Sequence, residues 1–169
     1  MIDYEIYNQI KEYANAHYKN SKDLYEKRNQ DPSEIFTYII NGKVAEWCAY
    51  ESLLEFGYIV DPPCMKILDK KDKSHEADLL VHGKDNILFK EKIHVHVKSV
   101  KRYKKLIFPL SFYIQRSDPL VKRPKENHYF FVMMKEDEYT YYPHKFICST
   151  EADFLDPVGD YPTNYRVEV

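Results

Sequence analysis

Three polar side chains that could do chemistry share one face of a strand-like segment. Residues 93–100, IHVHVKSV, alternate between branched apolar and polar side chains, the two-residue period of a half-buried strand. His94, His96 and Lys98 therefore project together from a rigid support, which suits a functional site. Imidazole can bind a transition metal, and an ammonium group can face a phosphate or an attacking water. A plain solvent-facing row on an edge strand is the alternative.

A carboxylate at the start of the preceding apolar run adds to this row. Asp78 opens the run DLLV, where a carboxylate is costly to bury unless it is paired or binds a metal. Glu76 shares its side of the expected strand, and residues 83–86 are long enough for a hairpin-like return. We therefore expect Asp78 to lie near His96 and Lys98.

Two helical regions precede these strands. Residues 4–27 carry apolar and aromatic side chains at approximately helical spacing, which predicts an amphipathic helix. Asp31-Pro32 is typical of a helix start, and a second helix is expected over residues 32–56 with Gly57 as its stop. We expect Asn41-Gly42 to break or kink that helix.

The remaining chain predicts strands joined by charged turns and one basic, irregular connection. The expected strand segments are 58–60, 65–68, 77–82, 93–100, 129–134, 139–142 and 146–149. A helical stretch is expected near residues 110–114. Helices followed by strands predict a mixed α/β or α+β domain with helices against a sheet. We expect one domain over residues 1–169, with a helical extension (1–30), a core (32–149) and an acidic, loop-rich tail (150–169).

The charge is unevenly distributed along the chain. Residues 89–125 carry eleven Lys and Arg against two acids, a balance of +9, although the whole chain has a net charge of −2. Such asymmetry indicates a surface that faces a polyanion, and a solvated basic face without a partner is the alternative. The basic residues expected to contact nucleic-acid phosphates are Lys101, Arg102, Lys104, Lys105, Arg116, Lys122, Arg123 and Lys125.

Other features of the sequence exclude or disfavour several classes of protein. Three widely spaced cysteines, no apolar signal core and no long apolar run predict a cytoplasmic protein without a membrane partner. With only four glycines there is no glycine-rich phosphate loop. A zinc site from Cys64, His75, His94 and His96 is disfavoured because no pair has a recognised zinc-finger spacing.

Three segments in order resemble the motifs of one nuclease superfamily. They are Glu46 in KVAEWCAYESLLEFGY, Asp78 in HEADLLV, and His96-Val97-Lys98 in IHVHVKSV. A helix glutamate, a strand aspartate and a strand with acid-x-lysine resemble the PD-(D/E)XK nuclease superfamily, over roughly residues 32–134. The resemblance implies a restriction endonuclease-like fold, in which helices flank a central mixed sheet, here with an extra N-terminal helix.

The resemblance also implies an activity. A member of this superfamily would be a metal-dependent endonuclease that hydrolyses phosphodiester bonds, with DNA favoured over RNA and Mg²⁺ or Mn²⁺ as cofactor. Asp78, His96 and Glu46 would hold the metal, and Lys98 would orient or help deprotonate the attacking water. A homodimer is left open.

His96 departs from the family pattern, which has Glu, Asp or Gln two residues before the lysine. Imidazole suits Mn²⁺ or another transition metal better than Mg²⁺, which favours oxygen ligands. Three interpretations remain open: an active site with altered metal preference, a carboxylate supplied by Glu46 or Glu76 instead, or an inactive fold that binds nucleic acid or a protein. A structural or inhibitory small protein with a plain polar row is a further alternative.

Overall fold

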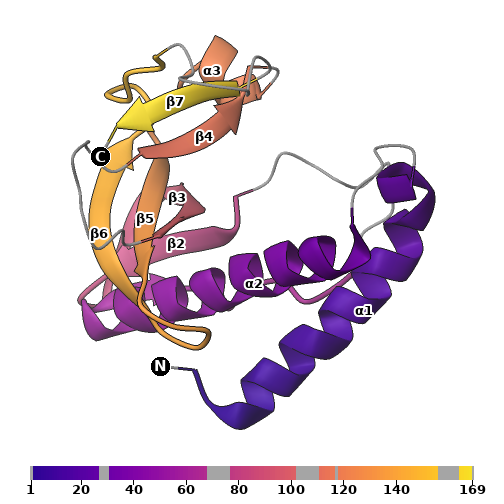
Figure 1. Ribbon diagram of the computed structural model, residues 1–169. Helices are drawn as coiled ribbons and strands as arrows, with labels where there is room; N and C mark the ends of the chain where they lie inside the picture. Colours follow the sequence, from indigo (N-terminus) through magenta and orange to yellow (C-terminus); the bar gives the residue numbers. More distant parts are fainter. Residues whose placement is uncertain are drawn as a thin grey trace.

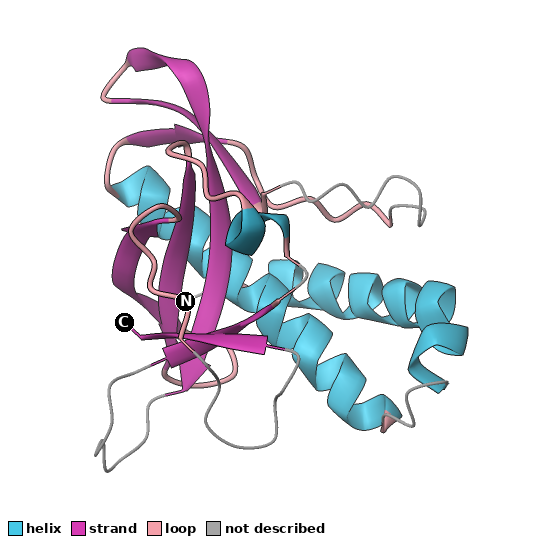
Figure 2. Ribbon diagram, turned by 90° about the horizontal axis from the view of Figure 1, so that it is seen from above, coloured by secondary structure: helices cyan, strands magenta, loops and turns pink. Residues whose placement is uncertain are grey.

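Helices and strands form three layers. The computed structural model describes residues 2–26, 31–67, 77–101, 111–116, 118–155 and 164–168. Two long helices lie on one side of a five-stranded sheet, and a two-stranded sheet with a short helix lies on the other (Figures 1 and 2). The expected mixed α/β class is confirmed.

The helices are α1 (Tyr4–Glu26), α2 (Pro32–Glu55) and α3 (Pro119–Lys122). Asp31 caps α2 by accepting a hydrogen bond from the main-chain N–H of Ser33 at 2.7 Å. Gly57 follows α2 with a φ of 81°, a conformation that glycine adopts readily. None of the helices in the described segments is long and apolar enough to cross a membrane.

The expected break in α2 at Asn41 and Gly42 is wrong, because the helix runs through both residues. A glycine in a helix interior costs only about 1 kcal/mol relative to alanine. Burial of the following turns offsets that cost, since Val44, Ala45 and Cys48 pack in the core. Tertiary packing therefore keeps this helix continuous.

The five-stranded sheet has the order β1-β2-β3-β5-β6. Its strands are β1 (Tyr58–Val60), β2 (Leu79–Lys84), β3 (Ile87–Lys101), β5 (His128–Lys135) and β6 (Tyr141–Cys148). All neighbouring pairs are antiparallel except β3 and β5, which are parallel. The β2–β3 hairpin turns at Asp85 and Asn86, whose φ values of 48° and 66° match a tight two-residue turn.

Several segments differ from their sequence-based prediction. The strands expected over residues 139–142 and 146–149 are one continuous strand, β6. The helix expected near residues 110–114 is instead the strand β4 (Ser111–Gln115), which pairs with β7 (Asn164–Glu168) inside the expected loop-rich tail. Residues 61–67 form no strand. A short apolar run such as that of β4 does not distinguish helix from strand, and its pairing partner lies about 50 residues away, so local pattern could not identify it.

Two hydrophobic clusters cover the two faces of the large sheet. On the helix face, Leu79 and Val95 pack with residues of α1 and α2. On the second face, Val100 and Phe130 pack with Val167 of β7 and with residues of β4 and α3. Because side chains alternate along β3, the polar row that includes His96 and Lys98 projects to the second face.

Candidate functional site

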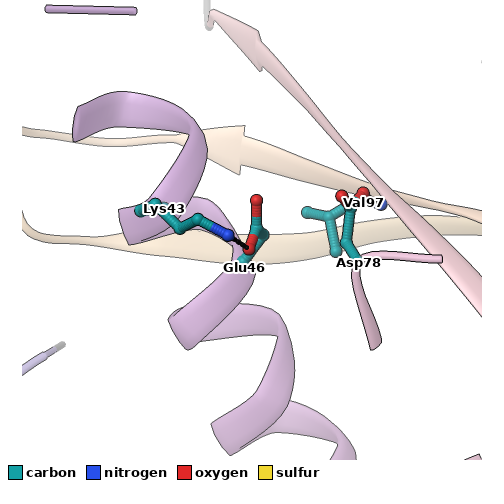
Figure 3. Close-up of polar contacts among 4 residues, drawn as sticks. All are labelled: Lys43, Glu46, Asp78 and Val97. Atoms are coloured by element: carbon teal, nitrogen blue, oxygen red, sulfur yellow. Dashed lines mark hydrogen bonds and ion pairs between the residues drawn. The ribbon is translucent and has the colours of Figure 1, made fainter. Parts of the chain in front are cut away.

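Asp78 lies immediately before β2, where the pairing of β2 with β3 begins at Leu79 and Val95. Its Oδ2 accepts a hydrogen bond from the main-chain N–H of Val97 at 2.7 Å (Figure 3). The carboxylate thus takes the place of a main-chain carbonyl of a neighbouring strand as the acceptor for this N–H of β3. Burial raises the pKa of Asp78, and the opposing effects of the Lys98 charge, the Val97 hydrogen bond and the Lys43 charge do not cancel it.

Glu46 approaches this carboxylate from α2 (Figure 3). Its Oε2 lies 2.5 Å from Nζ of Lys43, one helical turn earlier, and the two side chains are only 12% and 13% exposed. Burial and the charge of Asp78 raise the pKa of Glu46 to about 7, although Lys43 and Lys98 act to lower it. The same ion pair outweighs burial at Lys43 and raises the pKa of its ammonium group.

The charge of Lys98 reaches both carboxylates. It lowers the pKa of Asp78 and of Glu46, even though the lysine leaves β3 from the second face of the sheet. A half-buried carboxylate whose ionisation is hindered by a neighbouring carboxylate, as that of Glu46 is by Asp78, is stabilised by a shared proton or by a bound cation. The arrangement therefore has the charge pattern of a cation site with a lysine beside it.

His96 lies in a different environment from the two carboxylates. Its Nε2 is 3.0 Å from Nδ1 of His128, and the two rings are stacked with centroids 5.3 Å apart. His94 also stacks on His128, with the ring centroids 4.4 Å apart. Burial and neighbouring cations, led by Lys98 at His96 and by His94 at His128, lower the pKa of both histidines to about 4. The rings are thus neutral at pH 7.

The structure brings together part of the predicted site. Asp78 and Glu46 meet within reach of the Lys98 charge, whereas His96 pairs with His128. No three His, Cys, Asp or Glu side chains within the described ranges are placed to hold a metal ion, so the set Asp78, His96 and Glu46 is not assembled as three ligands. Glu76 and His75, named in the alternatives, lie outside the described residues.

The predicted phosphate-contacting residues divide between two places. Lys101 ends β3 and is exposed, and Arg102, Lys104 and Lys105 lie outside the described residues. Lys122, Arg123 and Lys125 are exposed at and just after α3, on the second face. The guanidinium of Arg116 lies 4.5 Å from the centre of the Tyr165 ring.

Two residues at the site were not predicted from the sequence. Lys43 pairs with Glu46 across one turn, and its spacing of three residues is the signal that could have indicated it. His128 meets His96 through the parallel pairing of β3 and β5. No local pattern predicts that contact, because the two residues lie 32 positions apart.

The comparisons with known proteins found no relatives. No protein-family model matches the chain, and neither the curated proteins nor the solved structures give a match. Only the residues of the chain itself therefore indicate what the site does.

Proposed function

We propose that the protein is a metal-dependent nuclease that hydrolyses phosphodiester bonds, with DNA favoured over RNA as substrate. The observation that carries the proposal is the pair of half-buried carboxylates, Asp78 and Glu46, on both of which the charge of Lys98 acts. Asp78 comes from the start of a central strand and Glu46 from the helix that covers the sheet. Both the order and the residue types agree with the superfamily that the sequence resembles.

The residues fit a hard divalent cation in part. Asp78 and Glu46 supply carboxylate oxygens, the ligands that Mg²⁺ and Mn²⁺ prefer, and these cations commonly complete their coordination with water and substrate phosphate. Such a cation would acidify a bound water and offset negative charge on the phosphate. The pairing of His96 with His128 favours the interpretation in which Glu46 supplies the carboxylate that this chain lacks at position 96.

The remaining groups would position the reactants. Lys98, whose charge acts on both carboxylates, would orient the attacking water or stabilise charge that builds on the phosphate. Lys43 holds Glu46 in place through the 2.5 Å ion pair. The main-chain N–H of Val97, on β3, holds Asp78 in place through a hydrogen bond. Each carboxylate therefore has a fixed orientation before substrate arrives.

A cleavage assay tests the proposal. Duplex DNA, single-stranded DNA and RNA of one sequence are incubated with the protein and Mg²⁺, and then with Mn²⁺. We expect Asp78→Asn and Lys98→Met to reduce cleavage at least about 100-fold. Glu55→Gln, which changes an exposed carboxylate on the same helix as Glu46, is the matched control and should cleave normally. Cleavage that survives both site changes would exclude this mechanism.

The second candidate function is a binding module for nucleic acid without catalysis. It is favoured by the lack of a three-residue metal group within the described residues and by the exposed cations around α3. Binding that weakens steeply with salt, combined with no cleavage under either metal, would establish this alternative.

A further inference from the structure

A cavity of about 460 Å³ lies between the first half of α2 and the carboxyl ends of β3 and β5. A volume of this size is in the range of small-molecule sites. Gly42 lines the cavity and lies one helical turn before Glu46, and Ser99 lines it one residue after Lys98. Tyr38, Asn41, Lys101 and Lys135 also line it.

Two lysines meet at the wall of this cavity. Lys101 and Lys135 are direct partners in the parallel pairing of β3 and β5, so both project to the helix face. Lys135 Nζ donates to Oδ1 of Asn41 at 2.6 Å and lies 5.7 Å from the centre of the Tyr141 ring. Burial and the charge of Lys101 lower the pKa of Lys135. The charged form of Lys135 is therefore made less stable by its burial and by Lys101.

The acidic groups near these lysines are not bound to them. Glu34 lines the cavity, and Asp137 and Glu138 are close enough to act on Lys135 electrostatically. Within the described segments no carboxylate forms an ion pair with Lys101 or Lys135. Two cations at one wall, one of them hydrogen-bonded to the neutral side chain of Asn41, favour a ligand that carries more than one negative charge.

Gly42 is a second, independent observation. It occupies the interior of a 24-residue helix, where glycine is less favourable than alanine. A Cβ added to Gly42 would meet no atom within 4 Å. The packing of the protein therefore does not require a glycine at this position, and a side chain here would extend into the open space of the cavity.

We propose that this cavity binds a phosphate ester of nucleotide size, with the phosphate group against Lys101 and Lys135. A phosphate monoester carries nearly two negative charges at neutral pH, each phosphodiester of a strand carries one, and both offer acceptor oxygens to the two ammonium groups. The ring of Tyr38, which is 68% exposed, provides an aromatic surface at the rim for a base. The ligand is either a free nucleotide or one nucleotide of a nucleic-acid strand.

Binding measured by calorimetry without metal tests this site separately from any cleavage. The probes are adenosine 5′-monophosphate, adenosine, inorganic phosphate and a short oligothymidylate. We expect adenosine to bind at least about tenfold more weakly than its monophosphate, because hydrogen bonds to charged groups are lost. Binding of the monophosphate identifies a free nucleotide as the source, and binding of the oligothymidylate alone identifies a strand.

Two variants locate the binding. Lys135→Met should weaken binding of the phosphate probe at least about tenfold, whereas Lys92→Met, at an exposed position on β3, should leave it unchanged. Gly42→Leu should block binding while raising the melting temperature by about 2 °C, because leucine fills the cavity and favours the helix. Failure of every phosphate probe to bind, or binding unaffected by both site variants, would overturn the proposal. Asp78→Asn should bind the probes normally, so loss of cleavage alone does not count against this cavity.

Discussion

The Oδ2 atom of Asp78 accepts a hydrogen bond of 2.7 Å from the main-chain N–H of Val97, at the point where β2 begins to pair with β3. This contact gives the aspartate a structural role in addition to its proposed chemical one. The β3 main chain would otherwise have an unpaired donor in a partly buried position. Substitutions at Asp78 can separate the two roles.

Asp78→Asn and Asp78→Ala should differ in stability although both remove the carboxylate. Asparagine keeps an acceptor for the Val97 N–H and removes a charge whose burial is unfavourable, so its free energy of unfolding should equal or exceed that of the wild type. Alanine leaves the donor unpaired, which costs about 1–3 kcal/mol. Urea unfolding of the two variants measures the difference. Equal stability would show that the hydrogen bond contributes nothing.

Divalent metal should stabilise the protein through both carboxylates. Mn²⁺ at 100 times its dissociation constant should add about 2.7 kcal/mol to the free energy of unfolding, a rise of about 5–10 °C in melting temperature. Glu46→Gln should remove most of this rise because the ion loses one carboxylate. Glu55→Gln, exposed at the end of the same helix, should retain it. A rise that is the same in both variants would place the metal elsewhere.

The stacked histidines should make the protein less stable in acid. The pKa of His96 and of His128 is about 4 in the fold, below the ordinary 6.5, so the unfolded chain binds protons first. This contribution to stability is present above pH 6.5 and is lost as the pH falls towards 4. His94, Lys98, Asp118 and Lys125 also act on the pKa values of the two rings. They therefore affect how much stability is lost in acid.

His128→Phe isolates this effect. Phenylalanine keeps an aromatic ring in the stack and cannot take up a proton, so the free energy of unfolding should vary less between pH 4 and 6.5 than in the wild type. Chemical denaturation at a series of pH values measures the two profiles. Parallel profiles would show that His128 does not titrate differently on folding.

The cations around α3 should set the salt dependence of DNA binding. Each phosphate contact contributes about 0.9 to the slope of log affinity against log salt for duplex DNA. Changing Lys122, Arg123 and Lys125 together to alanine should lower that slope by up to about 2.7. The control changes Lys90 and Lys145, which are exposed on other strands, to alanine. Fluorescence anisotropy at several salt concentrations gives the slopes, and a slope that is unaltered in the triple variant would exclude this surface.

The sequence predicted those parts of the structure that depend on local pattern. The alternation in IHVHVKSV predicts β3, and the capping residues at Asp31 and Pro32 predict the start of α2. The position of Asp78 beside β3 follows from the hairpin between them. That Glu46 lies near Asp78 could be predicted only from the resemblance to the nuclease superfamily. Nothing in the sequence of α2 indicates which of its turns faces Asp78.

Features that depend on distant pairing could not be predicted in this way. Lys101 and Lys135 meet because β3 and β5 are parallel and in one particular register, which is fixed by core packing between strands that are far apart in sequence. The same register brings His128 to His96. The expected helix at residues 110–114 was wrong for a similar reason, since only the partner strand β7 makes that run a strand.

The position of Val167 in the second cluster has a consequence for how the chain folds. This residue is 1% exposed and packs with side chains from β3, β4 and β5. The residues that cover the helix face end at Tyr141 in the sequence, but the second face also needs Val167 of β7. Completion of the side that carries the polar row of β3 therefore depends on the last described strand, whereas completion of the helix-covered side does not.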